Sequence, residues 1–243
     1  VSSNGKRILF LGWSSLGVKI LDSISGFLDD KSSVDIVFID DYCSSSIINL
    51  DYAFDINFLP VTPGFDLEDK LKNKNYDDVM IIGYSDKLSI NEADTFTLLK
   101  SLELDSIMRK NNFDCRVLTH ILNSSKSKLT EITHSKEIII SDNLSALLMA
   151  QLSENYHLYR VFEKLFSSEH SSINIFPIDF YVELGKEITY KQVVLTAAIK
   201  NHNAVGLMFK SMDSTDDQER LEVNPKKSMT FTPSKGDSLI VIS

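Results

Sequence analysis

The turn that follows the first apolar segment carries residue types suited to binding a dinucleotide. Gly12, Ser14 and Gly17 fill the three fixed positions of the pattern G-x-G-x-x-G, although Ser14 replaces the glycine that lets the backbone approach a pyrophosphate. Asp40 ends the second apolar segment, where an acidic residue binds a ribose. Two alternatives stay open, a nucleotide site and a fold that has kept the turn without the ligand. The candidate nucleotide-binding residues are Gly12, Ser14, Gly17, Asp40 and Gly83.

A second group of side chains is acidic and could hold a hard cation. Asp40 and Asp41 follow the second apolar segment, and Asp86 follows the fourth, ahead of Glu92 and Asp94. In a doubly wound sheet these segment ends converge on one crevice, which would repel phosphate and offer Ca²⁺ the oxygen ligands that it prefers. The alternative is structural: Asp86 caps a turn, while Glu92 and Asp94 complement a helix dipole.

Other catalytic and metal-binding patterns have little support. A nucleophile elbow needs a glycine two residues after its serine, and Leu16 stands in that place after Ser14. None of the five histidines has the spacing or the cysteine partner of a zinc site. Tyr84 has Lys87 three residues later, but on a turn, which disfavours a Rossmann oxidoreductase. The sequence therefore favours a binding module.

Alternating strands and helices must position these side chains. Short apolar segments bounded by turn residues predict buried parallel strands at residues 6–12, 34–39, 56–61, 78–83, 115–122 and 137–140. Helical patterns lie at residues 16–27, 66–71, 91–111 and 124–133. Six such units with right-handed crossovers predict an α/β fold, a Rossmann-like doubly wound parallel sheet.

Beyond Asp142 the pattern changes to two apolar helices separated by a polar turn, a helix-turn-helix crossover. Because these two helices are so apolar, we expect them to pack on a partner subunit. The candidate interface residues are Leu144, Leu147, Leu148, Leu152, Tyr159, Phe162 and Phe166. A small α+β C-terminal lobe follows, with strands at 172–176, 204–209 and 238–242, a helix at 190–200 and a polar loop at 211–220. The expected domains are 1–141, 142–168 and 169–243.

The composition and charge of the chain exclude some classes of binding partner. The chain has 243 residues, 43% of them apolar, which is enough for one large domain or two small ones. Its formal charge of −9 argues against nucleic acid, because affinity for a phosphate backbone depends on clustered cations. The apolar stretches fall far short of the roughly 20 residues of a membrane span, so a soluble, cytosolic fragment is expected. Val1, without an initiator Met or a signal sequence, indicates a processed or excised start.

Several segments, in this order and spacing, resemble a known family. They are Lys6–Trp13, Tyr84–Asp86, Glu92–Asp94, Thr97–Leu99, Ser141–Leu144, Ala150–Asn155, Phe176–Pro177, Tyr181 and Val205–Gly206. These segments are similar to the C-terminal cytosolic region of the Castor/Pollux ion channels and their bacterial relatives. The chain as a whole resembles an RCK domain, the regulator-of-conductance module of ligand-gated cation channels. Ser14 departs from the glycine pattern, and the chain contains no pore helices.

The resemblance implies a regulatory domain and not an enzyme. It implies pairing through the crossover helices, four subunits in a gating ring at the cytoplasmic face of a membrane, and a pore domain upstream. Ca²⁺ is the first ligand that it implies and NAD or another nucleotide the second, with binding coupled to the pore by a population shift. The alternatives are a peripheral NAD- or ATP-binding regulator of a potassium uptake system and a ligand-free dimerisation module.

Overall fold

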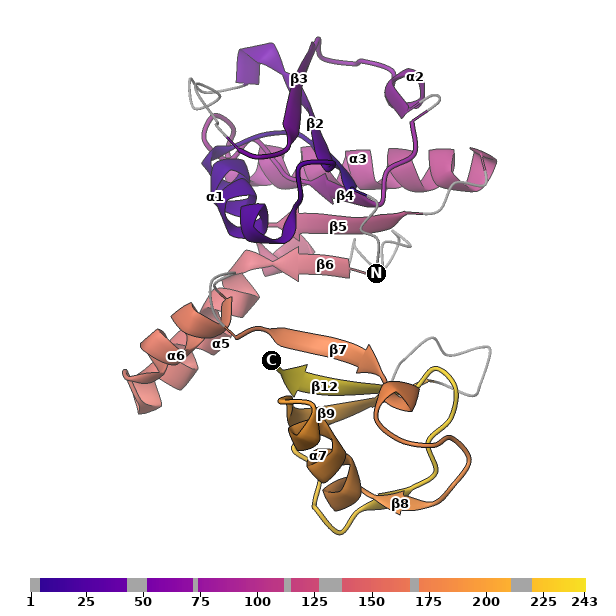
Figure 1. The fold of residues 1–243 in the computed structure, drawn as a ribbon. Helices are drawn as coiled ribbons and strands as arrows, with labels where there is room; N and C mark the ends of the chain where they lie inside the picture. The colour runs from indigo at the N-terminus through magenta and orange to yellow at the C-terminus, as the bar shows by residue number, and fades with distance from the viewer. Residues whose placement is uncertain are drawn as a thin grey trace. The chain divides into compact units, whose positions relative to one another are not determined.

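The computed structural model describes residues 5–42, 52–71, 74–111, 115–126, 137–166, 171–210 and 220–243. The chain forms two compact units, Val1–Leu158 and Tyr159–Ser243 (Figure 1). The three expected domain boundaries stay predictions. No helix in the described ranges is long and apolar enough to cross a bilayer.

The first unit is built around a parallel sheet with the strand order β3-β2-β1-β4-β5-β6. Its strands are β1 (Arg7–Leu11), β2 (Ser33–Ile39), β3 (Asp55–Val61), β4 (Asp78–Ile81), β5 (Arg116–Ile121) and β6 (Glu137–Ile140). The chain therefore enters at the centre of the sheet, extends it to one edge and then returns to extend it to the other. The reversal between β1 and β4 is the switch point at which doubly wound folds form a ligand crevice.

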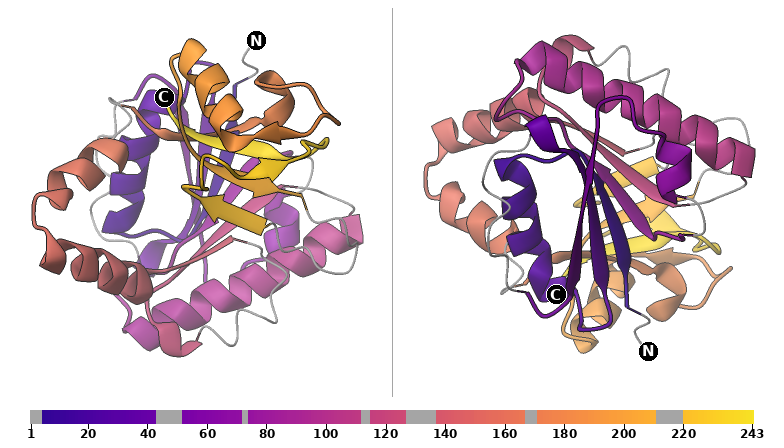
Figure 2. Two further views of the ribbon diagram at one scale, coloured as in Figure 1. Left: turned by 90° about the horizontal axis from the view of Figure 1, so that it is seen from below. Right: turned by 90° about the horizontal axis from the view of Figure 1, so that it is seen from above.

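Helices cover both faces of this sheet, as right-handed crossovers in opposite directions require. Figure 2 shows α1 (Ser15–Ile24), which connects β1 to β2, on one face and α3 (Ile90–Asn111), which connects β4 to β5, on the other. The short helix α2 (Leu67–Leu71) packs beside α3. Single 3-10 turns follow α1, β2 and β5, namely η1 (Ser25–Phe27), η2 (Asp40–Tyr42) and η4 (Ser124–Lys126).

The interior strands β1 and β2 supply much of the core of the first unit. Residues 8–11 of β1 and 34–39 of β2 are all buried, because neighbouring strands and helices cover both of their faces. Trp13 extends this core past the end of β1, and its ring meets Phe10 edge to face with the centroids 5.7 Å apart. Each fully buried apolar side chain contributes about 1.5–3 kcal/mol, so β1 and β2 fix the position of everything attached to their ends.

Asp35 is a buried carboxylate within the apolar strand β2. It accepts hydrogen bonds from Asn57 Nδ2 at 2.8 Å, Lys74 Nζ at 2.7 Å and the Tyr76 hydroxyl at 2.6 Å. Burial by itself would raise the carboxyl pKa, but these hydrogen bonds outweigh it and hold the pKa of Asp35 below its usual value of 3.8. The carboxylate thereby ties β2 to β3 and to the segment that enters β4.

The end of the sheet leads directly into the crossover helices. α5 (Ser141–Glu154) begins directly after the last residue of β6, and α6 (Leu158–Phe166) follows it. His120 on β5 holds the start of α5, because its Nε2 lies 2.5 Å from Ser141 Oγ. Burial lowers the pKa of His120 below 6.5, against the opposing effect of the Asp94 carboxylate. Burial therefore favours the neutral form of the His120 imidazole.

The second unit is an α+β lobe. Its antiparallel sheet has the order β10-β9-β12-β7. The strands are β7 (Ile173–Pro177), β9 (Asn203–Phe209), β10 (Arg220–Val223) and β12 (Ser238–Ile242), with η5 (Ile178–Phe180) after β7. α7 (Tyr190–Ile199) packs on β9 and starts in a capping box between Thr189 and Gln192. β8 (Ile188–Thr189) and β11 (Thr230–Phe231) form a separate small sheet.

The fold class expected from the sequence is confirmed. The six apolar segments became the six parallel strands, and the crossover helices and the α+β lobe follow in the expected order. Most of the helix expected at 124–133 and nearly all of the polar loop at 211–220 lie outside the described residues. The short strands β8, β10 and β11 were not predicted, because two to four residues carry too little periodicity.

The Asp35 network generates a prediction about acid stability. We expect Asp35→Asn to lower the free energy of unfolding at pH 7 by about 2 kcal/mol, because Lys74 and Tyr76 lose an anionic acceptor. Because its pKa is lower in the folded state, Asp35 stabilises the fold above pH 4 and loses this effect as the pH falls. Urea unfolding of both proteins from pH 7 to pH 3 should therefore show the two curves converging.

The matched control for this experiment is Asp105→Asn, which removes a half-buried carboxylate paired with the exposed Arg109 one helical turn away. Such partly exposed pairs contribute at most about 1 kcal/mol. An equal loss in the two variants, or a difference between wild type and Asp35→Asn that does not change with pH, would contradict the prediction.

Candidate functional site

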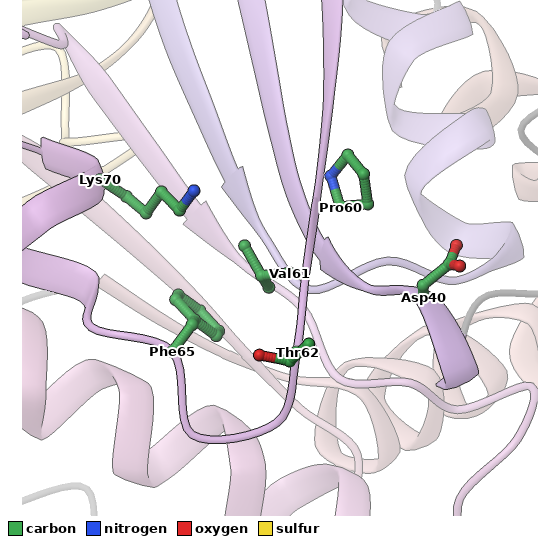
Figure 3. A pocket seen from close by; sticks show the side chains of 6 residues that line it. All are labelled: Asp40, Pro60, Val61, Thr62, Phe65 and Lys70. Carbon is green, nitrogen blue, oxygen red and sulfur yellow. The ribbon is translucent and has the colours of Figure 1, made fainter.

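The carboxyl ends of β2 and β3 border a pocket of about 460 Å³. Figure 3 shows Asp40 and Lys70 at opposite ends of it, with Thr62 between them. Its full lining is Asp40, Pro60, Val61, Thr62, Phe65 and Lys70. We call this the Asp40 pocket. It offers a carboxylate, an ammonium group and a hydroxyl to a small polar ligand.

The elements around the Asp40 pocket explain how these side chains are placed. Asp40 starts η2 directly after β2, whereas Lys70 comes from α2, which returns from β3 toward the sheet. The Lys100 ammonium of α3 lies 4.1 Å from the centroid of the Phe65 ring and fixes the wall of the pocket by a cation–π contact. Sequence reasoning found Asp40 but not Lys70, Thr62 or Phe65. The available signal was the break at Thr62 that ends the third apolar segment.

The glycine turn is filled by the chain itself. Gly12 adopts φ +85°, and a Cβ there would lie 2.0 Å from the Ile82 carbonyl oxygen, so only glycine fits this close approach of backbones. A Cβ on Gly17 would lie 2.6 Å from the Trp13 ring. Among the described residues, the buried Ser14 hydroxyl has no hydrogen-bond partner. The two glycines therefore make room for protein atoms.

The loop between β4 and α3 bridges the switch point. The Tyr84 side chain is 1% exposed, and its hydroxyl accepts a hydrogen bond from the Ile39 N–H at 2.8 Å. Because β1 separates β4 from β2, this phenol lies across the carboxyl end of β1. Asp86 accepts hydrogen bonds from the Ser15 N–H at 2.6 Å and from Ser15 Oγ at 2.9 Å. The loop therefore contacts both β2 and the first residue of α1.

The remaining acidic candidates hold the ends of α3 and β5. Glu92 Oε2 accepts from Ser89 N–H at 3.0 Å and Ser89 Oγ at 2.6 Å, a capping box that holds the pKa of this exposed carboxyl below 4.5. Asp94 is 1% exposed and accepts from the N–H groups of Leu122 at 2.8 Å and Asn123 at 3.1 Å.

These contacts bear on the expected Ca²⁺ site. In the part of the chain that the structure describes, no three His, Cys, Asp or Glu side chains form a group that could hold a metal ion. Asp40 and Asp41 lie together in η2, but Asp86, Glu92 and Asp94 each bind donors of the chain elsewhere. Gly83 is also tightly packed, because a Cβ there would lie 2.9 Å from Ala93. Among the described acids no such group forms, and the Ca²⁺ site and its ligands stay predictions.

The candidate interface residues lie on helices that expose much of their apolar surface. None of the residues of α5 or α6, all of them described, is buried. Leu147 is 67% exposed and Phe166 63%, and Leu144 and Tyr159 are also exposed. Leu148, Leu152 and Phe162 are intermediate. Phe162 and Phe166 stack on one another with centroids 6.1 Å apart.

Comparison of the fold with solved structures defines the class. The human SLO3 gating ring superimposes on 99% of this chain and 48% of its own chain, with a TM-score of 0.70 and 13% identity. That level of identity establishes the shared fold alone. The chain has the architecture of an RCK gating-ring domain.

The sequence is similar to Castor/Pollux-type channels. The probable ion channel SYM8 of Pisum sativum is 27% identical over 128 residues, and the ion channel POLLUX of Lotus japonicus is 23% identical over 128 residues. Each match covers 52% of this chain but only 14% and 13% of the channels. No family model matches the chain. The resemblance to an RCK domain of a Castor/Pollux-type channel is confirmed.

The buried Asp94 carboxylate allows a test between a structural and a metal-binding role. We expect Asp94→Asn to lower the free energy of unfolding by about 2 kcal/mol, because the amide group can accept from only one of the two N–H groups. The melting temperature of wild type and variant, each measured with and without 1 mM Ca²⁺ after chelation, should show no Ca²⁺ effect that depends on Asp94. A Ca²⁺ shift present in wild type and lost in the variant would restore Asp94 as a metal ligand.

Proposed function

We propose that this chain is a non-catalytic regulatory domain of an ion channel, which assembles with copies of itself into a gating ring at the cytoplasmic face of a membrane. Two findings support the proposal, the sequence similarity to plant ion channels and the gating-ring fold. The pore domain would lie in the same protein, upstream of this chain. The observation that carries the proposal is the apolar surface of α5 and α6.

Isolated short helices are marginal in water, and packing of an apolar face normally supplies their stability. α5 and α6 bury none of their residues within this chain, although Leu147, Met149 and Phe166 are each more than 60% exposed. An apolar surface of this kind marks an interaction site. A second copy of the chain is the partner that a ring requires, and four subunits around one pore are the arrangement that we propose.

The Asp40 pocket is the ligand site that we propose for this regulator. Its two charges lie on different elements, Asp40 on η2 and Lys70 on α2. Glu68, also on α2, forms an ion pair with Lys110 near the end of α3, with both carboxylate oxygens 2.9 Å from the ammonium. A ligand that draws Lys70 toward Asp40 therefore moves α2 against α3.

Coupling to the pore follows from differential binding. A ligand shifts a ring between two arrangements only by the difference in its affinity for them. A change from mostly closed to mostly open requires about 5.5 kcal/mol, which four identical sites could supply at roughly 1.4 kcal/mol each. Each site then needs only about a tenfold preference for one arrangement, a modest demand on an open pocket.

Assembly through α5 and α6 predicts a change of mass. We expect Leu147→Glu to convert an oligomeric chain to a monomer, because a carboxylate would be buried in the interface without a partner. The melting temperature of the monomer should not fall, since Leu147 is 67% exposed within the chain. Size-exclusion chromatography with light scattering measures the mass. Ile199→Glu is the matched control, an 83% exposed apolar residue on α7, and should leave the mass unchanged. Retention of the oligomer in Leu147→Glu would remove α5 from the interface.

The Asp40 pocket predicts a loss of ligand response in the full-length channel. In excised patches we expect a low-molecular-weight cytosol filtrate, depleted of Ca²⁺ by a chelator, to change the open probability. Asp40→Asn and Lys70→Gln should each raise the half-maximal filtrate concentration at least tenfold. Lys31→Gln, which removes an exposed lysine before β2, should have no effect. A response to Ca²⁺ alone that neither pocket substitution alters would place the ligand elsewhere.

A further inference from the structure

The switch point between β1 and β4, where a doubly wound fold admits a dinucleotide, is occupied here by the chain itself. A pyrophosphate in such a fold accepts hydrogen bonds at the N-terminus of the first helix, whose dipole favours an anion. In this chain the first residue of α1 donates both its N–H and its hydroxyl to Asp86. The carboxylate thus lies in the place of a ligand phosphate.

The start of α1 depends on this distant carboxylate. α1, described in full, has no acidic residue in its first turn, and its N-cap Ser14 makes no side-chain capping bond. Helix starts usually obtain their side-chain capping bond from nearby residues, as α7 does with Thr189 and Gln192. Asp86 supplies the negative charge and the acceptor from 71 positions away.

The loop between β4 and α3 also blocks the path that a dinucleotide would take across the carboxyl end of β1. Tyr84 spans from the end of β4 to the last N–H of β2, and the rings of Tyr42 and Phe96 pack on it at centroid distances of 5.4 Å and 4.8 Å. A dinucleotide that crossed this point would have to displace a side chain that is 99% buried. Gly12 offers it no space either, because Ile82 occupies the position of the missing Cβ.

We infer that the segment Gly83–Asp86 is an internal substitute for a dinucleotide: Asp86 replaces the phosphate and Tyr84 covers the path over β1. Phosphate-bearing ligands are excluded from the N-terminus of α1, whereas the Asp40 pocket to one side stays open to a ligand. The inference rests on the proposed function only in this second statement. The exclusion itself depends on Asp86 and Tyr84 alone.

The test is thermal unfolding of the chain with two probes, NAD and inorganic pyrophosphate, each at up to 5 mM. Neither should shift the melting temperature of the wild type by more than 1 °C. Asp86→Ala should melt several degrees lower, and pyrophosphate should restore at least half of that loss by refilling the vacated position. Asp77→Ala is the matched control, because Asp77 also accepts a backbone N–H, that of Arg7 at 2.8 Å, but at the start of a strand. Pyrophosphate should not rescue it.

Asp86→Ser removes the charge with a side chain shorter than that of Asp86, so it also vacates the position and provides the same readout if the alanine variant does not fold. The inference is overturned if NAD or pyrophosphate stabilises the wild type, or if pyrophosphate rescues neither Asp86 variant more than the Asp77 control. These outcomes are independent of the mass of the Leu147→Glu variant and of channel currents, which test the proposed function. The exclusion of phosphate-bearing ligands and the proposed channel function can therefore be contradicted independently of one another.

Discussion

Burial of β1 and β2 on both faces is the constraint on which the rest of the first unit depends. Two strands without a solvent face must lie in the interior of the sheet, so β3 is added outside β2 and β4 outside β1. The strand order then reverses between β1 and β4, and the loops that carry Asp40, Tyr84 and Asp86 emerge along one edge. Nearer the amino end of β2, Asp35 joins this strand to β3 and to the segment that leads into β4.

At the carboxyl ends of the parallel strands, the hydrogen-bond partners of the polar groups determine which of these groups a ligand could contact. Asp86 and Asp94 each accept two hydrogen bonds from the chain, and the glycines of the first turn accommodate Ile82 and Trp13. This edge keeps the form of a nucleotide-binding fold while its central part is used for packing. The Asp40 pocket lies to one side, where α2 leaves a pair of opposite charges facing the same space.

The sequence was sufficient for the architecture because buried parallel strands are near-continuous apolar segments. The sequence also predicted that Asp40, Asp86 and Asp94 lie at strand or helix ends. It did not predict the hydrogen-bond partners, because Ser15 is 71 positions from Asp86 and Leu122 is 28 positions from Asp94. Glu92 is different. Ser89 and Glu92 form the local S-x-x-E pattern of a capping box, so its structural role was readable without any structure. Lys70 could not be found, because its place in the pocket depends on how α2 returns to the sheet.

The apolar exposure of α5 and α6 also has a thermodynamic consequence. Neither helix has a buried residue within its own chain, so contacts with other subunits would add to the stability of both. In the proposed ring, the folding free energy of α5 and α6 would therefore depend on subunit concentration by mass action. A tethered pore would then act as a concentrating device: by bringing four copies together it would raise the effective local concentration of each into the millimolar range. Attachment to a pore in the membrane would in this way stabilise α5 and α6, the helices through which we propose that the subunits assemble.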